Sequence, residues 1–234
     1  MLFQKKMRYW HWIFLAVLLL CCVPIRAWAA QNTVVVLDAG HGGEDGGAVA
    51  TDGTPESGIN LQITKKAEWL LLFAGYQTVL TREGEDAVYS PDATTLRQKK
   101  VSDLKNRVAL INNTKNAFVI SIHQNSLPSH PKVHGAKVFY NTVEPAAQAG
   151  SAVQQALNEA VNREDERPVT AIDSTIYLMK ESHQPAILVE CGFLSNPEES
   201  KQLQEPSYQL RLATAIVAGF AEFSTNRDGS TYED

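Results

Sequence analysis

The sequence predicts a single α/β domain built on a mostly parallel, twisted sheet with helices on both faces. Apolar runs rich in β-branched residues recur at 34–37, 117–122 and 185–189. Runs without a polar interruption are typical of strands that are buried on both faces. Segments with helical periodicity separate these runs, as in βαβ units. The length of 234 residues, 44% of them hydrophobic, suits one domain with a sizeable core.

The first three elements form a βαβ unit. A strand over 34–37 is followed by a polar loop over 44–60 that contains Glu56. A helix of roughly fourteen residues comes next and ends at Gly75, a residue that favours helix C-termini. A second strand over 76–81 then completes the unit and predicts parallel neighbours.

A second helix is predicted over 97–113. We expect the polar segment before it, 83–96, to be a mobile loop near the candidate functional site described below. Asp103 and Arg107 stand four residues apart in this helix and predict an ion pair. One face of the helix is apolar and is expected to reach the core: Val101, Leu104, Val108 and Ile111.

The remaining elements alternate in the same way. Asn196 and Pro197 predict a helix N-terminus, because Asn is a preferred cap and Pro suits the first helical position. The other expected elements are strands over 117–123, 136–140 and 185–189, a short strand over 174–179, and helices over 144–161 and 206–223.

Residues 1–29 read as a signal peptide or, if uncleaved, an N-terminal membrane anchor. A basic start precedes an apolar run over 13–23, and Ala27-Trp28-Ala29 fits a cleavage site. The run is shorter than the roughly 20 residues of a membrane span. We expect one folded domain over 30–225 and a flexible tail over 226–234. Either reading of the leader exports the body across a membrane.

Charge and cysteine content exclude two classes of protein. The net charge is −5 and the four basic residues of the leader have no acidic counterpart there, so the body is acidic. An acidic body without a basic cluster argues against nucleic-acid binding. Only Cys191 lies outside the leader, which excludes an internal disulfide in the body.

Three apolar strands lead into groups that bind metals or transfer protons: His41, His123 and Glu190. Parallel strands bring their carboxyl ends to one edge of the sheet, where α/β proteins bind ligands. Glu56 in the first loop adds a carboxylate. Two histidines and one carboxylate form a ligand set of catalytic zinc, and Glu190 is then free to handle protons.

Each residue also has an ordinary structural interpretation. His41 can be a loop residue, His123 a hydrogen-bonded strand residue and Glu56 a solvated carboxylate. Glu190 is harder to dismiss, because an ionised carboxylate at the end of an apolar strand is costly unless it is paired. Ser121 points to the same side as His123 and is expected to support it. Other candidates have less support. Three histidines are in predicted loops and do not follow a strand: His130, His134 and His183. Cys191 is expected to be a small buried core residue and not a nucleophile.

Five motifs follow one another along the chain: Leu37-Asp38-Ala39-Gly40-His41-Gly42-Gly43, Asp45-x-Gly47-Ala48, Glu56 before Asn60-Leu61, Ser121-Ile122-His123-x-Asn125, and Val189-Glu190-x-Gly192-Phe193-Leu194-Ser195-Asn196. In residue type and order they resemble the zinc-dependent N-acetylmuramoyl-L-alanine amidases, the Amidase_3 family. The resemblance spans roughly 34–223. It implies one zinc ion held by His41, Glu56 and His123, with Glu190 as the catalytic glutamate.

The resemblance also implies the reaction and the partners. The substrate would be peptidoglycan, cut between the lactyl group of N-acetylmuramic acid and L-alanine of the stem peptide. Asn125, Arg107 and His134 are the candidate substrate-binding residues, although for Arg107 the ion pair with Asp103 is the plainer role. The stretch 177–179 and the compact form resemble the sporulation branch. Ser57-Gly58 departs from the charged pair that usually follows the glutamate.

Three alternatives stay open at this point. A zinc carboxypeptidase acting on stem peptides would use the same metal ligands. A wall-binding module without catalysis would require a missing ligand or base. The third is an enzyme that remains inactive until a partner protein activates it.

Overall fold

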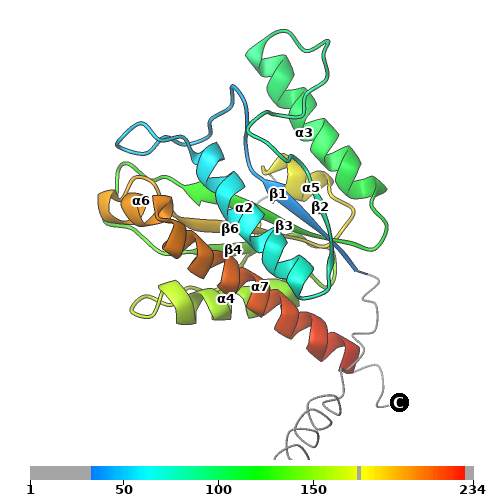
Figure 1. Ribbon diagram of the computed structural model, residues 1–234, viewed down its shortest axis with the longest axis vertical. Coiled ribbons are helices and arrows are strands. Elements are labelled where there is room, and N and C mark those ends of the chain that lie inside the picture. The colour runs from blue at the N-terminus through cyan, green and yellow to red at the C-terminus, as the bar shows by residue number, and fades with distance from the viewer. Residues whose placement is uncertain (1–32, 173–174, 230–234) are drawn as a thin grey trace, which may run out of the picture. The chain divides into compact units, whose positions relative to one another are not determined.

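The computed structural model describes residues 33–172 and 175–229, which belong to one compact unit beginning at Thr33 (Figure 1). Its centre is a six-stranded sheet with the order β2-β1-β3-β6-β4-β5. Pairing is parallel except between β4 and β6. The strands are β1 Val34–Ala39, β2 Gln77–Leu80, β3 Ala117–Asn125, β4 Lys137–Tyr140, β5 Thr170–Ala171 and β6 Ala186–Phe193.

Helices cover both faces of the sheet, as the sequence predicts. Figure 1 shows α2, α4 and α7 on one face and α3 and α5 on the other. The short α6 lies between β6 and α7 in the chain. The helices are α2 Glu56–Phe73, α3 Leu96–Asn113, α4 Ala146–Val161, α5 Tyr177–Glu181, α6 Pro197–Gln204 and α7 Pro206–Gly229.

The sheet divides the core into two apolar clusters. The larger joins alternate residues of β1, β3 and β6 to α2, α4 and α7, where Phe118 packs against Phe220 with ring centroids 4.9 Å apart. The smaller joins the opposite residues of these strands to α3 and α5. Because both faces of the central strands are buried, their apolar runs show no alternation with polar residues.

Several predicted elements have different boundaries or types. Glu56 is the first residue of α2 and not part of the preceding loop. Residues 177–181 form a helix, so the short strand predicted over 174–179 is wrong for 177–179. Residues 173 and 174 lie outside the described part of the chain. Val101 is exposed, because the side of α3 that faces the sheet presents Asp103 and Arg107. Asn196 caps α6 as predicted.

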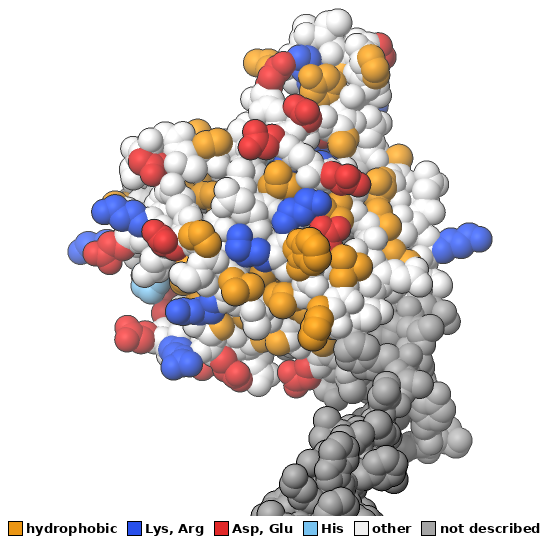
Figure 2. Space-filling model, viewed as in Figure 1, with side chains coloured by type: hydrophobic (Ala, Val, Ile, Leu, Met, Phe, Trp, Pro, Cys, Tyr) orange, Lys and Arg blue, Asp and Glu red, His pale blue; other side chains and the backbone are white. Residues whose placement is uncertain are grey.

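The outer face of α2 is unusually apolar. Figure 2 shows apolar side chains gathered on the side of the domain that carries this helix, and the exposed large apolar residues of α2 are Trp69, Leu72 and Phe73. Within 33–172 and 175–229, no helix is long and apolar enough to cross a membrane. The predicted leader lies outside the described residues.

Candidate metal and catalytic site

His41, Glu56 and His123 converge on one point at the edge of the sheet. His41 follows the end of β1, Glu56 begins α2, and His123 lies in β3. One Glu56 oxygen lies 3.0 Å from Nδ1 of His123, and the other lies 3.5 Å from Nε2 of His41. One nitrogen or oxygen from each of the three lies within 4.8 Å of the other two. All three therefore point into the same small volume.

Two glycines leave room for these side chains. A Cβ on Gly40 would collide with the His123 ring. Gly47 has φ +71°, and a Cβ there would lie 2.5 Å from Oε2 of Glu56 and 2.7 Å from Cδ2 of His41. Gly40 and Gly47 are thus required because the backbone passes close to the three side chains at both positions.

The Glu56 carboxylate is held by several donors. The backbone N–H of Ala48 donates to Oε2 over 2.8 Å, and the N–H of Gln124 donates to Oε1 over 3.0 Å. The Asn60 amide donates to Oε1 as well as to the carbonyl of Gly40. Burial raises the pKa of Glu56, but the hydrogen bond and charge of His123 and the other donors outweigh this effect and bring the pKa down to about 2.

Asp45 lies beside the ring of His41, at the nitrogen that does not face Glu56. An Asp45 carboxylate oxygen lies 3.1 Å from Nδ1 of His41, whereas Nε2 faces Glu56. Metal-binding histidines commonly present one nitrogen to the ion and the other to a carboxylate, which sets the tautomer and the ring orientation. The sequence placed Asp45 in a motif but indicated no role for it.

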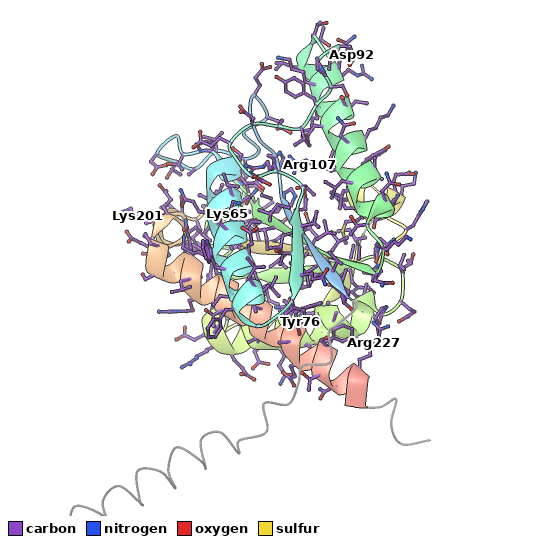
Figure 3. The ribbon with its side chains drawn as sticks, turned by 45° about the vertical axis from the view of Figure 1, so that its right-hand side comes forward. Lys65, Tyr76, Asp92, Arg107, Lys201 and Arg227 are labelled. Atoms are coloured by element: carbon purple, nitrogen blue, oxygen red, sulfur yellow. The ribbon has the colours of Figure 1, made fainter. Side chains whose placement is uncertain are left out.

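Arg107 is buried, with its side chain 2% exposed, at the inner wall of the cavity that holds the three side chains (Figure 3). It pairs with Asp38 at 2.7 Å and with Asp103 at 2.8 Å, so the predicted Asp103 ion pair is present. The same guanidinium donates to the carbonyls of Ala39 and His41, each over 2.7 Å. These contacts support the ligand-bearing loop, and contact of Arg107 with a substrate stays a prediction.

The loop needs this support because His41 has φ +61°, a left-handed conformation that is uncommon for residues other than glycine. A second buried arginine, Arg82, donates to the carbonyls of Ala39 and Gly40. Ser121, expected to support His123, instead donates to Asp38 over 2.6 Å. It thus stabilises the carboxylate that binds Arg107.

Glu190 lies beside His123, because the two residues are paired in the register of β6 and β3. Its Oε2 is buried and has no hydrogen-bond partner among the described residues. Burial raises the pKa of Glu190 to about 7; the charge of Glu56 adds to the increase, and His123 and His41 oppose it. A carboxyl group in this state can accept and release a proton near neutral pH.

The three side chains fit a zinc ion by chemistry and spacing. One nitrogen from each imidazole and one carboxylate oxygen lie within 4.8 Å of one another, and zinc accepts nitrogen and oxygen ligands of this kind. Three protein ligands leave a coordination position open, which is the arrangement of catalytic zinc sites. The unpartnered Oε2 of Glu190 adds a proton acceptor in the same cavity.

Comparison with known proteins identifies the family. The family model described as N-acetylmuramoyl-L-alanine amidase, Amidase_3, matches residues 35–222. The chain belongs to this amidase family. The match confirms the family, the α/β fold and the amidase activity that the motifs imply.

Relatives of this amidase include the germination-specific N-acetylmuramoyl-L-alanine amidase of Bacillus subtilis, 32% identical over 84% of this chain and 82% of the relative. Among solved structures, the CwlD amidase from Clostridioides difficile, in complex with the GerS lipoprotein, is 37% identical. It covers 82% of this chain and 98% of its own, with a TM-score of 0.78. The AmiC2 amidase of Nostoc punctiforme is 28% identical, with coverage of 83% and 98% and a TM-score of 0.70.

The site of this amidase opens into a cavity of about 370 Å³ between the sheet edge, α3 and the segment before α5. His41, Glu56, His123 and Glu190 all line it. Asn125 and His134, the other candidate substrate-binding residues, are not among its lining residues; His134 lies in the loop beside Arg167. Several residues of the wall were not predicted from the sequence, among them Lys100, Ile176 and Tyr177.

Proposed function

We propose that this amidase hydrolyses the bond between the lactyl carbonyl of N-acetylmuramic acid and L-alanine with the help of one zinc ion. The observation that carries the proposal is the convergence of His41, Glu56 and His123 within 4.8 Å, beside the unpartnered carboxyl of Glu190. Zinc bound there supplies Lewis acidity, which polarises a carbonyl and lowers the pKa of a water molecule towards about 7.

Glu190 acts as the general base and then as the general acid. It takes a proton from the attacking water and returns it to the departing amine of L-alanine. Its position beside His123 and its buried, unpartnered Oε2 support both roles. Asp45 and Asn60 orient His41 and Glu56 from behind, so that the ligand set is preorganised before substrate arrives.

The decisive experiment uses the full-length protein and purified peptidoglycan. Mass spectrometry of the digest should give free stem peptides that begin with L-alanine, beside glycan without stems. A carboxypeptidase would instead shorten the stems and leave them attached. Chelation should abolish the release of stems and added zinc should restore it.

Glu190→Gln separates catalysis from metal binding. This change keeps the size of the side chain but removes the proton acceptor, so we expect zinc content near that of the wild type and no measurable turnover. Residual hydrolysis at close to the wild-type rate would exclude Glu190 as the base. Loss of zinc from the variant would assign Glu190 to metal binding.

The spore cortex is the expected substrate within peptidoglycan. Support comes from the similarity to the germination-specific amidase of B. subtilis and to the CwlD amidase. Digestion of cortex and vegetative peptidoglycan side by side tests this, because equal rates on both would argue against a cortex enzyme. The CwlD amidase was solved in complex with the GerS lipoprotein, which supports a partner protein for this chain, with activation as its expected role. Full activity of the purified zinc-loaded protein alone would exclude that requirement.

Export is expected on the sequence of the leader, with a catalytic domain over 30–225 and a tail over 226–234. The mass of the protein recovered from a bacterial host tests these limits. A mature chain starting near Ala30 in the wall fraction indicates cleavage, and the full-length chain in the membrane fraction indicates an anchor.

A further inference from the structure

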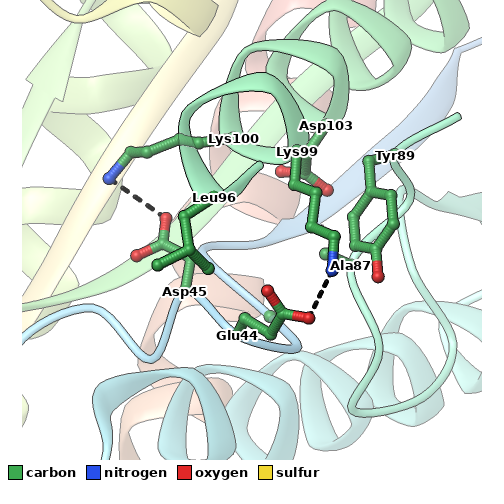
Figure 4. Close-up of a pocket in the computed structure, with 9 residues that line it drawn as sticks. Glu44, Asp45, Ala87, Tyr89, Leu96, Lys99, Lys100 and Asp103 are labelled. Carbon is green, nitrogen blue, oxygen red and sulfur yellow. Dashed lines mark hydrogen bonds and ion pairs between the residues drawn. The ribbon is translucent and has the colours of Figure 1, made fainter. Parts of the chain in front are cut away.

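A second cavity of about 180 Å³ adjoins the catalytic one and contains two lysines (Figure 4). It lies between the loop after β1, the segment after β2 and the start of α3. The two cavities have Asp45, Lys100 and Asp103 in common as wall residues. A ligand seated over the metal ligands can therefore extend past Lys100 into the second cavity.

Lys99 and Lys100 both keep donors for a ligand. In Figure 4, Lys99 pairs with Glu44 and Lys100 pairs with Asp45, the latter at 3.1 Å. An ammonium group has three N–H donors, so one acidic partner leaves donors unused. The Lys100 side chain is 55% exposed, and ion pairs that open to solvent are weak enough for a ligand to displace.

The other groups of the cavity suit a peptide. The ring of Tyr89 lies 5.0 Å from the Lys99 ammonium, and Leu96 and Ala87 add apolar surface. Asp103 does not repel an anion strongly, because its carboxylate is bound by Arg107 and by the N–H of Val88. The cavity thus combines two ammonium groups and three carboxylates, each carboxylate paired with a cation, with an apolar wall.

The position of Lys100 relates the cavity to the scissile bond. One oxygen of Asp45 lies 3.1 Å from Nδ1 of His41 and 3.1 Å from Nζ of Lys100. The ammonium is therefore separated from the metal-ligand histidine by a single carboxylate. An extended peptide advances ~3.3–3.6 Å per residue, so a carboxylate one or two residues beyond the cleaved amide would reach Lys100.

We propose that Lys99 and Lys100 form an anion subsite that binds a free carboxylate of the stem peptide, on the side of the cleaved bond that leaves with the amine. The inference rests on the proposed amidase function and specifies the peptide that the site prefers. Stem peptides with a free carboxylate on the residue after L-alanine should be better substrates than stems in which that group is a carboxamide.

The test compares two synthetic muramoyl tripeptides that differ only in this group, with zinc-loaded full-length protein. For Lys100→Gln and Lys99→Gln we expect KM for the carboxylate substrate to rise about tenfold, the effect of one lost charge-assisted hydrogen bond. The kcat value and the KM for the carboxamide substrate should change little. The control is Lys105→Gln, which removes an exposed lysine of the same helix that lines neither cavity.

Two results would overturn the subsite. Equal losses on both substrates would mean that the lysines act only through Asp45 and His41, and unchanged kinetics would mean that they bind nothing. If the wild-type protein cleaves neither substrate, the proposed function fails, and calorimetric titration with the free tripeptides decides on the subsite alone. Carboxylate-dependent binding that the lysine variants lose supports it, and equal or absent binding of the two tripeptides rejects it.

Discussion

The guanidinium of Arg107 donates to the main-chain carbonyl of His41 over 2.7 Å and, at the same time, pairs with Asp38 at the same distance. One buried cation thus joins the end of β1 to a residue whose backbone is left-handed. The side chain of His41 is directed into the site because its carbonyl is held from behind. Arg107 is therefore a positioning residue, and two predictions follow from its partners.

Replacement of Arg107 should destabilise the fold strongly. Arg107→Met leaves Asp38 and Asp103 buried without their cation, and the loss of one partner from a buried pair costs about 3–5 kcal/mol. Chemical denaturation measures the free energy of unfolding. The matched control is Arg97→Met on the exposed side of the same helix, which should change stability by less than about 0.5 kcal/mol. Similar losses of unfolding free energy in the two variants would contradict the stabilising role of Arg107.

The pairing of Asp38 predicts how stability depends on pH. Burial raises the pKa of Asp38, but Arg107, His123, Ser121 and Thr81 outweigh it and lower the value to about 2. Because the pKa is lower in the folded state, the stabilisation is complete above about pH 4 and is lost as the pH falls towards 2. The difference in unfolding free energy between the wild type and Asp38→Asn should shrink by about 2 kcal/mol across this range. A difference independent of pH would argue against the lowered pKa.

Alanine at the two motif glycines should abolish zinc binding without unfolding the domain completely. In Gly40→Ala the new methyl group occupies the space of the His123 ring, and in Gly47→Ala it displaces Glu56 and His41. Zinc per chain after dialysis against limiting metal is the measurement. Gly58→Ala is the control, since its Cβ meets nothing within 4 Å and alanine favours the helix. We expect it to keep its zinc and to gain up to about 1 kcal/mol of stability.

Asn60 should contribute to zinc affinity although it cannot touch the ion site directly. Its amide ties Glu56 to the carbonyl of Gly40, and loss of such a partner typically weakens metal binding by about 10–100-fold. Competition with a chelating dye measures the affinity of Asn60→Ala. Equal affinities of variant and wild type would show that the backbone donors of Ala48 and Gln124 hold Glu56 sufficiently.

The sequence allowed the sheet and most of the site to be predicted because both depend on local patterns. Buried parallel strands read as apolar runs, and their carboxyl ends lie at one edge, so the proximity of His41, His123 and Glu190 could be inferred before the structure was known. The start of α2 was missed because its N-cap is Pro55, which has no side-chain oxygen to signal a cap.

The supporting groups could not be predicted, because they act across long separations in the chain. Arg107 lies 69 residues from Asp38, and Asn60 lies 20 residues from the Gly40 carbonyl that it binds. No periodicity reports such contacts. On the inner face of α3, Asp103 and Arg107 share the buried positions with Val108 and Ile111 of the expected apolar stripe, whereas Val101 of that stripe is exposed.

The origin of the four central side chains divides the chain into two functional parts. The three candidate ligands come from the loop after β1, from α2 and from β3, within residues 34–125, whereas the proton acceptor comes from β6. Inactivating changes should therefore fall into two classes that metal analysis can tell apart. Substitutions around β1, α2 and β3 would give protein without zinc, whereas substitutions around β6 would give protein that binds zinc but is inactive. A zinc-loaded, inactive relative of this chain would therefore be expected to carry its change near β6.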